Sequence, residues 1–174
     1  SRVLITIFFS SVVYFLAFIP VNILGARDVN MISVFDPDEF AQYPHVARML
    51  DQPADSLARS VYRFVAYQHY YYGYPFYFYS AVIALLPLKA LAGLGSTTYN
   101  MLLLRQMVSV LPMLLAIGLL VYVQTKFQQY WRSTLLFLFL ITVPAVIRND
   151  VWWHPESLVF FFIVLTFYLL SKDD

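Results

Sequence analysis

Two clusters of ionisable residues interrupt a largely apolar chain, and carboxylates in such a setting suggest chemistry at the boundary between membrane and water. The first cluster is Asp36-Pro37-Asp38-Glu39, and the second comprises Arg148, Asn149, Asp150, His154 and Glu156. Carboxylates can act as general bases or hold a hard divalent cation, whereas Arg and His can neutralise a phosphate. Ionisable groups near membrane depth are costly and usually mark function. Both clusters are therefore candidate sites.

Each cluster also has a purely structural explanation. Asp36 is a favourable helix N-cap, Pro37 suits the first helical position, and Glu39 would complete a capping box. Arg148 and Asp150 could form a local ion pair at the end of another helix. The two explanations are compatible, because a helix cap can also hold a catalytic carboxylate rigidly.

The composition indicates that membrane helices position these residues. The chain has 174 residues, of which 61% are hydrophobic and 12% charged, and its mean hydropathy is +0.68. Long apolar runs in such a chain are typical of an integral membrane protein. A net charge of +1 gives no reason to expect nucleic acid as a partner. The absence of cysteine excludes disulfides, thiolate zinc sites and a cysteine nucleophile.

Five hydrophobic segments can be read from the sequence: 3–24, 76–94, 101–123, 134–147 and 158–170. We therefore predict an all-α integral membrane fold of about five hydrophobic helices, with residues 1–174 forming a single transmembrane module. The first segment is long enough to span, and it exceeds a usual signal-peptide core and lacks a following Ala-x-Ala. The last two segments are short for a hydrocarbon core of about 30 Å. They need flanking residues such as Trp152 and Trp153, or a protein environment.

The interval 25–73 is predicted to be an extracytoplasmic loop with short amphipathic helices lying on the membrane. Apolar residues recur at helical spacing after Asp36, and Pro44 is expected to kink or interrupt that helix. Residues 52–55 indicate a turn, after which a second interfacial helix begins. The aromatic stretch 69–75 is typical of a membrane entry point.

The predicted number of membrane crossings conflicts with the expectation that the two polar clusters meet. Arg2 favours a cytoplasmic N-terminus, which puts Asp36–Glu39 in the periplasm or a lumen. If all five segments cross, the two polar clusters lie on opposite sides of the membrane. Segment 76–94 or segment 134–147 would have to stop short of crossing to bring them together. Lys126 and Arg132 favour a cytoplasmic loop, which points to segment 76–94 as the exception.

The order of these motifs resembles the N-terminal portion of the C-type (GT-C) membrane glycosyltransferase superfold, in particular glycosyltransferase family 39. That family includes protein O-mannosyltransferases and aminoarabinose transferases. Its Asp-Glu-x-x-Tyr-x-x-x-Ala-x-x-Met motif is echoed by Asp38-Glu39, a shifted Tyr43, Ala47 and Met49. Tyr72-Gly73-Tyr74-Pro75-Phe76 takes the place of a Lys-Pro-Pro-Leu-type motif, without the Lys and with one Pro. Arg105 and Arg148…Asp150 match an Arg and an Arg…Asp that the family carries later.

The resemblance implies a transferase that moves a hexosyl or pentosyl group from a polyprenyl-phosphate donor to an acceptor. The donor would enter laterally from the lipid, and the site would face the outside of a bacterial plasma membrane. Asp38 would be the general base. The residues implied in substrate binding are Glu39, Tyr74, Arg105, Arg148 and His154. A divalent cation, Mg²⁺ or Mn²⁺, held by Asp38 and Asp150 is an alternative means of neutralising the phosphate.

Two other functions compete with this interpretation. One is a non-catalytic scaffold derived from the same fold, which acts with other membrane subunits. The other is a transporter fragment, although transporters usually place ionisable residues inside their spans. Family members are longer, so we expect residues 1–174 to be part of a larger protein and inactive alone. The catalytic interpretation predicts that the clusters converge, with the Asp38 and Asp150 carboxylates within about 10 Å.

Overall fold

The structure, a computed structural model, describes residues 2–27, 32, 36–50, 56–65, 71–92 and 95–172. Every regular element in that part of the chain is a helix. The bounds are α1 Arg2–Gly25, α3 Pro37–Leu50, α4 Leu57–Val65, α5 Tyr74–Tyr79, η1 Ser80–Leu85, α6 Leu86–Ala92, α7 Thr97–Leu104, η2 Arg105–Val110, α8 Leu111–Thr125, α9 Tyr130–Ile141, α10 Pro144–Asp150 and α11 Glu156–Leu170, where η1 and η2 are π-helical. The predicted turn at 52–55 and the first residues of the aromatic stretch lie outside the described residues.

Two of the described helices are long and apolar enough to cross a membrane. They are α1, with 24 residues, and the continuous helix Thr97–Thr125, with 29 residues. At about 1.5 Å per residue, both exceed the hydrocarbon thickness of about 30 Å. The pair α9 and α10 adds a third span if it is counted as one, and α11 is a shorter apolar helix. The described part of the protein is thus all-helical, and fewer of its helices are long and apolar enough to span a membrane than the five predicted.

The predicted continuous segment 134–147 is broken in the structure. Helix α9 ends at Ile141, and α10 begins at Pro144 after a bend of 61°. Pro144 disfavours a helical conformation at the residue before it, and Val143 is accordingly extended. The Thr142 hydroxyl donates to the Leu138 and Phe139 carbonyls, which satisfies the end of α9. A proline and a threonine therefore turn one predicted span into two helices.

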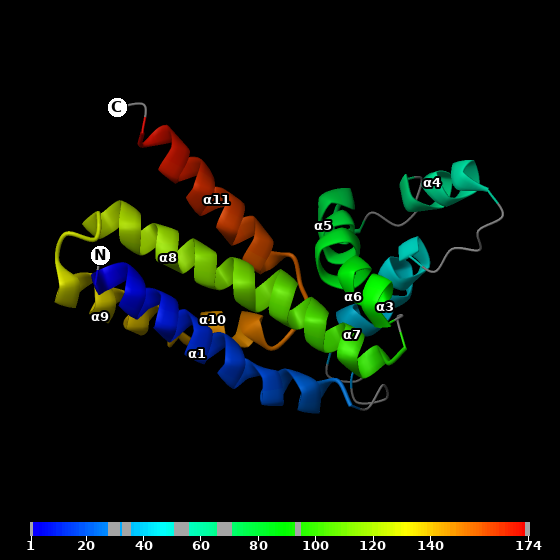
Figure 1. The fold of residues 1–174 in the computed structure, drawn as a ribbon, viewed down its shortest axis with the longest axis horizontal. Coiled ribbons are helices and arrows are strands. Elements are labelled where there is room, and N and C mark those ends of the chain that lie inside the picture. Colours follow the sequence, from blue (N-terminus) through cyan, green and yellow to red (C-terminus); the bar gives the residue numbers. More distant parts are fainter. Residues whose placement is uncertain are drawn as a thin grey trace.

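The predicted segment 76–94 instead forms part of the helix α5–η1–α6, which stands beside α3 and α7 (Figure 1). The Lys89 ammonium of α6 donates to the carbonyl of Leu50, the last residue of α3. Helix α3 itself is uninterrupted from Pro37 to Leu50, so of the two effects predicted for Pro44, a kink or an interruption, the interruption does not occur. These contacts hold the polar loop helix against the membrane helices.

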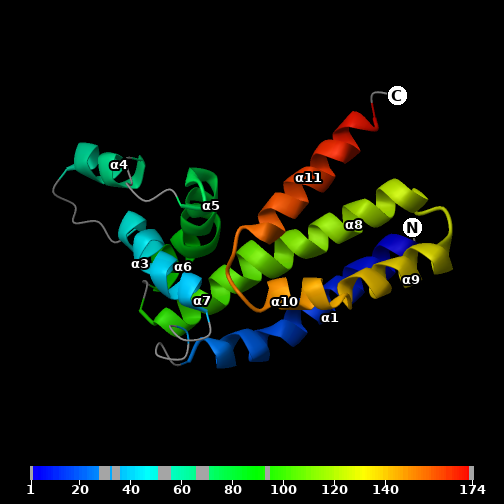
Figure 2. The ribbon, with the colours of Figure 1, turned by 180° about the vertical axis from the view of Figure 1, so that it is seen from behind.

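The long helices run between two opposite ends of the molecule. Both termini and the α8–α9 connection lie at one end, whereas α3, α5 and the start of α7 lie at the other (Figures 1 and 2). Helix α1 leads away from the terminal end, Thr97–Thr125 returns, α9 and α10 lead away again, and α11 returns. Helix α8 packs against both α11 and α9, and α1 packs against α9 and η2. The two polar clusters consequently share the end remote from the termini.

This arrangement can be tested by single-cysteine labelling, because the chain has no native cysteine. We expect a membrane-impermeant maleimide to label Gln128→Cys and Ser171→Cys from one side, and Ser96→Cys from the other. All three positions are exposed. Labelling of Ser96→Cys from the same side as Gln128→Cys would contradict the arrangement.

Candidate functional site

The centre of the polar end is an ion pair between Glu39 and Arg105. The Arg105 Nε donates to Glu39 Oε1 at 2.9 Å, and Nη2 donates to Oε2 at 2.5 Å. The two side chains are 0% and 1% exposed, respectively. Parallel hydrogen bonds of this kind are the strongest geometry available to a carboxylate and a guanidinium. The pair fastens α3 to the start of η2.

Residues of α1 and of the start of α3 surround the Arg105 guanidinium closely. Nη1 donates to the carbonyl of Asn22, 3.3 Å away, and Nη2 also donates to Asp36 Oδ2, 3.2 Å away. A Cβ built on Gly25 would lie 2.6 Å from Nη1, so the absence of a side chain there makes room for the arginine. Arg105 therefore joins α1, α3 and η2, and it is not free to bind a phosphate.

The capping box predicted between Asp36 and Glu39 does not form. The backbone N–H of Asp36 donates to the Ile32 carbonyl at 2.8 Å, so it has no need of the Glu39 side chain. The Asp36 carbonyl still accepts the first helical hydrogen bond, from the Phe40 N–H. Asp36 thus occupies the N-cap position, whereas its carboxylate and that of Glu39 both face Arg105.

Trp153 brings the second cluster to the first. Its backbone N–H donates to Glu39 Oε1, and its indole N–H donates to the Ser80 hydroxyl at 3.0 Å. Its ring stacks on Phe76 with centroids 5.0 Å apart. The predicted convergence of the two segments is therefore present, but a tryptophan backbone makes the contact. Burial raises the pKa of Glu39, against the opposing effects of Arg105 and of this N–H.

Asp38 differs from its buried neighbour because it remains half-buried at the start of α3. It lies close enough to Tyr72 and His154 to influence the titration of both. Burial raises the pKa of Tyr72, and the negative charge of Asp38 and a hydrogen bond to it add to the effect. The tyrosine is thus held protonated beside the carboxylate. Asp36 is also partly exposed, but its carboxylate is paired with Arg105.

His154 lies between aromatic rings. It stacks on Trp152 with centroids 4.4 Å apart and planes 9° from parallel, and it meets Tyr72 edge-on at 4.8 Å. Its Nδ1 lies against the Glu156 carboxylate. Burial lowers the pKa of His154, while Asp38 acts to raise it. In the protein without a bound ligand, the His154 side chain is accordingly neutral at pH 7.

Asp150 is fully buried and belongs to a separate polar contact. Its Oδ2 accepts from the Tyr14 hydroxyl at 2.7 Å, and its backbone carbonyl accepts from the Asn22 amide at 3.0 Å. Its Oδ1 is buried without a hydrogen-bond partner in the described part of the chain. Arg148 is exposed in the last turn of α10. The predicted local Arg148–Asp150 pair is therefore replaced by contacts between Asp150 and α1.

The donor set does not fit the metal site implied for Asp38 and Asp150. Among the described residues, no group of three or more His, Asp or Glu side chains is placed to hold a metal ion. Asp38 faces Tyr72 and His154, whereas Asp150 is enclosed by Tyr14 and Asn22. We therefore assign no role to a divalent cation.

Tyr74, predicted to bind substrate, begins α5 and packs against Phe78 with ring centroids 5.9 Å apart. Tyr72 is the aromatic residue that reaches Asp38. Sequence reasoning also missed Asn22, which lies within the first apolar segment. A lone amide in a membrane span was the available signal for it.

Comparisons of the chain with protein-family models, with curated proteins and with solved structures find no match.

The ion pair gives a prediction about stability. Arg105→Met leaves the buried Glu39 carboxylate without its cation and should destabilise the protein by about 3–5 kcal/mol. Glu39→Leu combined with Arg105→Met removes both charges and should recover most of that loss. Thermal unfolding in detergent, followed by circular dichroism, measures both effects. A single variant as stable as the wild type would show that the pair has no structural role.

His154 gives a prediction about pH. Its pKa in the folded protein is below the ordinary value of about 6.5, so the unfolded chain binds more protons in that range. The contribution to stability is complete above about pH 6.5 and is lost as the pH falls through the lowered pKa. We expect the unfolding temperature to fall over this range, and to fall less in His154→Phe, which keeps a ring against Trp152. An identical decline in both proteins would assign the acid sensitivity to other groups.

Proposed function

We propose that the polar end is the active site of a membrane glycosyltransferase that uses a polyprenyl-phosphate sugar donor. The observation that supports this most is the different environment of two adjacent carboxylates. Glu39 is buried and locked to Arg105, whereas Asp38 is half-buried beside Tyr72 and His154. Base catalysis needs a carboxylate held rigidly yet open to the acceptor. The fixed ion pair of Glu39 supplies the rigidity, and Asp38, the residue before it, is the proposed base.

In the proposed reaction Asp38 takes the proton of an acceptor hydroxyl. The acceptor oxygen then forms a bond to the anomeric carbon of the donor sugar, and the bond from that carbon to the phosphate oxygen breaks. The products are the glycosylated acceptor and the polyprenyl phosphate. The proton on Asp38 returns to water or to the departing phosphate.

The contacts revise the roles that the resemblance implies for the basic residues. Arg105 is committed to Glu39 and Asp36, so it positions the site instead of binding the donor. His154 is the basic group that lies beside Asp38. The approach of an anionic phosphate favours protonation of a neighbouring imidazole. His154 would thereby become the cation that stabilises the leaving group.

The aromatic side chains of this end suit the other parts of such a donor. Trp152 and Tyr72 flank His154 and offer faces on which a sugar ring can pack. The rings of Trp and Tyr are largely apolar and carry one polar group, which also suits the first units of a lipid tail at a membrane boundary. We place this end on the outer side of a bacterial plasma membrane. This is the side that the resemblance to the GT-C superfold implies.

A non-catalytic scaffold is the second candidate, and one observation favours it. Arg105 and Glu39, two charges that the resemblance assigns to substrate, are paired with each other inside the protein. A scaffold would keep such a pair for folding after losing transfer. Stoichiometric copurification with another membrane subunit, without transfer activity, would support this candidate.

The decisive experiment is substitution of Asp38. Asp38→Asn keeps the shape of the side chain but cannot accept the proton, so transfer from a polyprenyl-phosphate sugar should fall at least about 100-fold. The unfolding temperature should stay unchanged, because Asn is favourable near a helix start.

Asp36→Asn is the matched control. The same chemical change two residues earlier keeps an oxygen for Arg105 and a good N-cap. It should therefore leave transfer within a few-fold of the wild type. Both variants are assayed in the full-length protein that contains these residues. Equal activity of the Asp38 and Asp36 variants would refute the base, and absence of transfer by that wild-type protein with every donor would favour the scaffold.

A further inference from the structure

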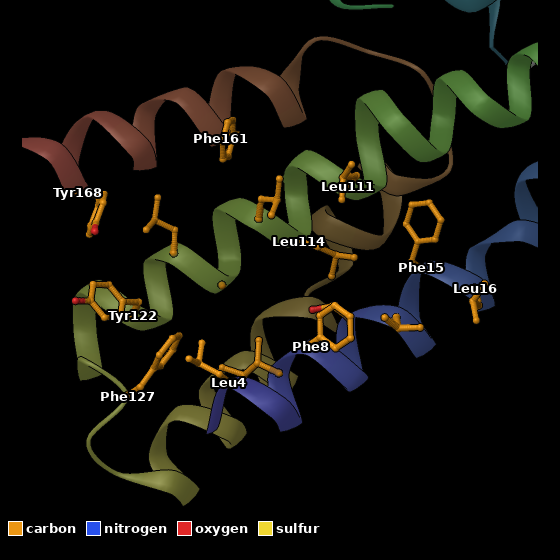
Figure 3. A pocket seen from close by; sticks show the side chains of 16 residues that line it. Leu4, Phe8, Phe15, Leu16, Leu111, Leu114, Tyr122, Phe127, Phe161 and Tyr168 are labelled. Atoms are coloured by element: carbon orange, nitrogen blue, oxygen red, sulfur yellow. The ribbon is translucent and has the colours of Figure 1, made fainter. Parts of the chain in front are cut away.

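A long apolar groove lies at the other end of the molecule from Asp38. It has a volume of about 810 Å³ and is formed by α1, α8, α11 and Phe127 (Figure 3). Helix α8 forms its floor, Phe8 and Phe15 lie along one wall, and Phe161 and Tyr168 lie along the other. Nearly all of its lining is hydrocarbon. The groove therefore suits an apolar occupant.

The length of the groove indicates the kind of occupant. Its lining runs from Leu4 to Leu16 on α1 and from Leu111 to Tyr122 on α8. These stretches correspond to about 18 Å and about 16 Å at 1.5 Å per residue. That is roughly half of a hydrocarbon core of about 30 Å. One lipid chain from one leaflet matches this length, whereas a transmembrane helix would need the full thickness.

The floor of the groove is open at Gly118. A Cβ built on this residue would meet no atom within 4 Å, so the backbone of α8 borders the space directly. An occupant can therefore approach the helix axis more closely there than elsewhere along α8.

One end of the groove is built for a negatively charged headgroup. Tyr122 and Tyr168 meet edge-on at 5.7 Å at this end. The Lys126 ammonium lies 5.4 Å from the centre of the Tyr122 ring, and that of Lys172 lies 4.7 Å from the centre of the Tyr168 ring. Both lysines are exposed, so their ammonium groups remain available to a further partner. Aromatic residues with Lys above them are typical of the level of lipid headgroups.

A small polar pocket adjoins this end. It has a volume of about 160 Å³, lies on the α8–α9 connection, and is lined by Lys126, Arg132 and the side chains of Gln124, Gln128 and Gln129. Lys126 thus belongs both to this pocket and to the aromatic end of the groove. Amide and cationic groups of this kind can hydrogen-bond a phosphate and its substituents.

We propose that the groove binds one anionic phospholipid of the leaflet opposite the Asp38 site. One acyl chain lies along α8 between α1 and α11, and the phosphate lies between Lys126 and Lys172. The lipid fills a gap in the packing of α1, most of whose surface is otherwise exposed. This assignment concerns the other end of the molecule and does not depend on the proposed transfer reaction.

The test uses the purified, delipidated protein in detergent, with dioleoyl phosphatidylglycerol and dioleoyl phosphatidylcholine as competing probes. Native mass spectrometry counts the lipids that remain bound. We expect one phosphatidylglycerol to be retained in preference to phosphatidylcholine. Lys126→Ala and Lys172→Ala should each reduce that preference about fivefold, the usual effect of one basic residue near an anionic headgroup. Arg59→Ala, on α4 at the other end, should leave it unchanged.

A second variant tests the chain-binding part separately. Gly118→Leu fills the open floor and also improves helix propensity, so the protein should remain folded. It should reduce retention of both lipids at least about tenfold, whereas Ala145→Leu, on an exposed face of α10, should not. Equal retention of the two lipids by the wild type, or unchanged preference in both lysine variants, would overturn the anionic site. Undiminished retention in Gly118→Leu would overturn the groove.

Discussion

The fold of the polar end depends on the buried ion pair between Glu39 and Arg105. Removing two charges from water is costly, and the cost is offset only when geometry is good and the remaining polar atoms are also satisfied. Arg105 meets this condition through Asn22 and Asp36, and Glu39 meets it through the Trp153 N–H. The pair therefore joins α1, α3, η2 and the α10–α11 connection at one point. A helix that would otherwise lie loosely on the membrane surface becomes part of the rigid core.

This junction explains how segments far apart in the sequence share one end of the molecule. The bend between α9 and α10 turns the chain so that Trp153 reaches Glu39. His154, the residue after it, then lies near Asp38 and stacks on Trp152. The arrangement leaves one carboxylate fixed and its neighbour accessible, and it places the apolar groove and its lysines at the opposite end. The two ends thus differ in both charge and chemistry.

The sequence was sufficient to predict the helical fold of the described residues, the presence of helices long enough to span a membrane, and the contact between the segments that carry the two polar clusters. A long apolar run indicates directly that a helix is suited to a lipid environment. A cluster of acids beside a bilayer requires cations nearby. The individual roles could not be predicted, because they depend on which side chain is enclosed. Glu39 and Asp38 are adjacent and chemically similar, yet only the first points at Arg105. The contact between Trp153 and Glu39 is made by a backbone N–H, for which side-chain identity gives no signal. Segment 134–147 was misread because its average hydropathy conceals the effect of one proline.

The two π-helical segments have a consequence for how this chain can change. Each π turn contains one residue more than the α-turn it replaces, and such turns often occur at functional sites. Segment η2 begins at Arg105, and η1 begins at Ser80, which accepts the Trp153 indole N–H. The segments pack against each other. Loss of a single residue from η2 would convert the π turn to an ordinary α-turn, with Arg105 and α8 keeping their relative orientation. The same deletion within the regular turns of α8 would rotate the two parts of that helix by about 100° relative to each other. The π-helical segments are therefore the places where this chain can lose a residue while the register between the long helices and the polar end is kept.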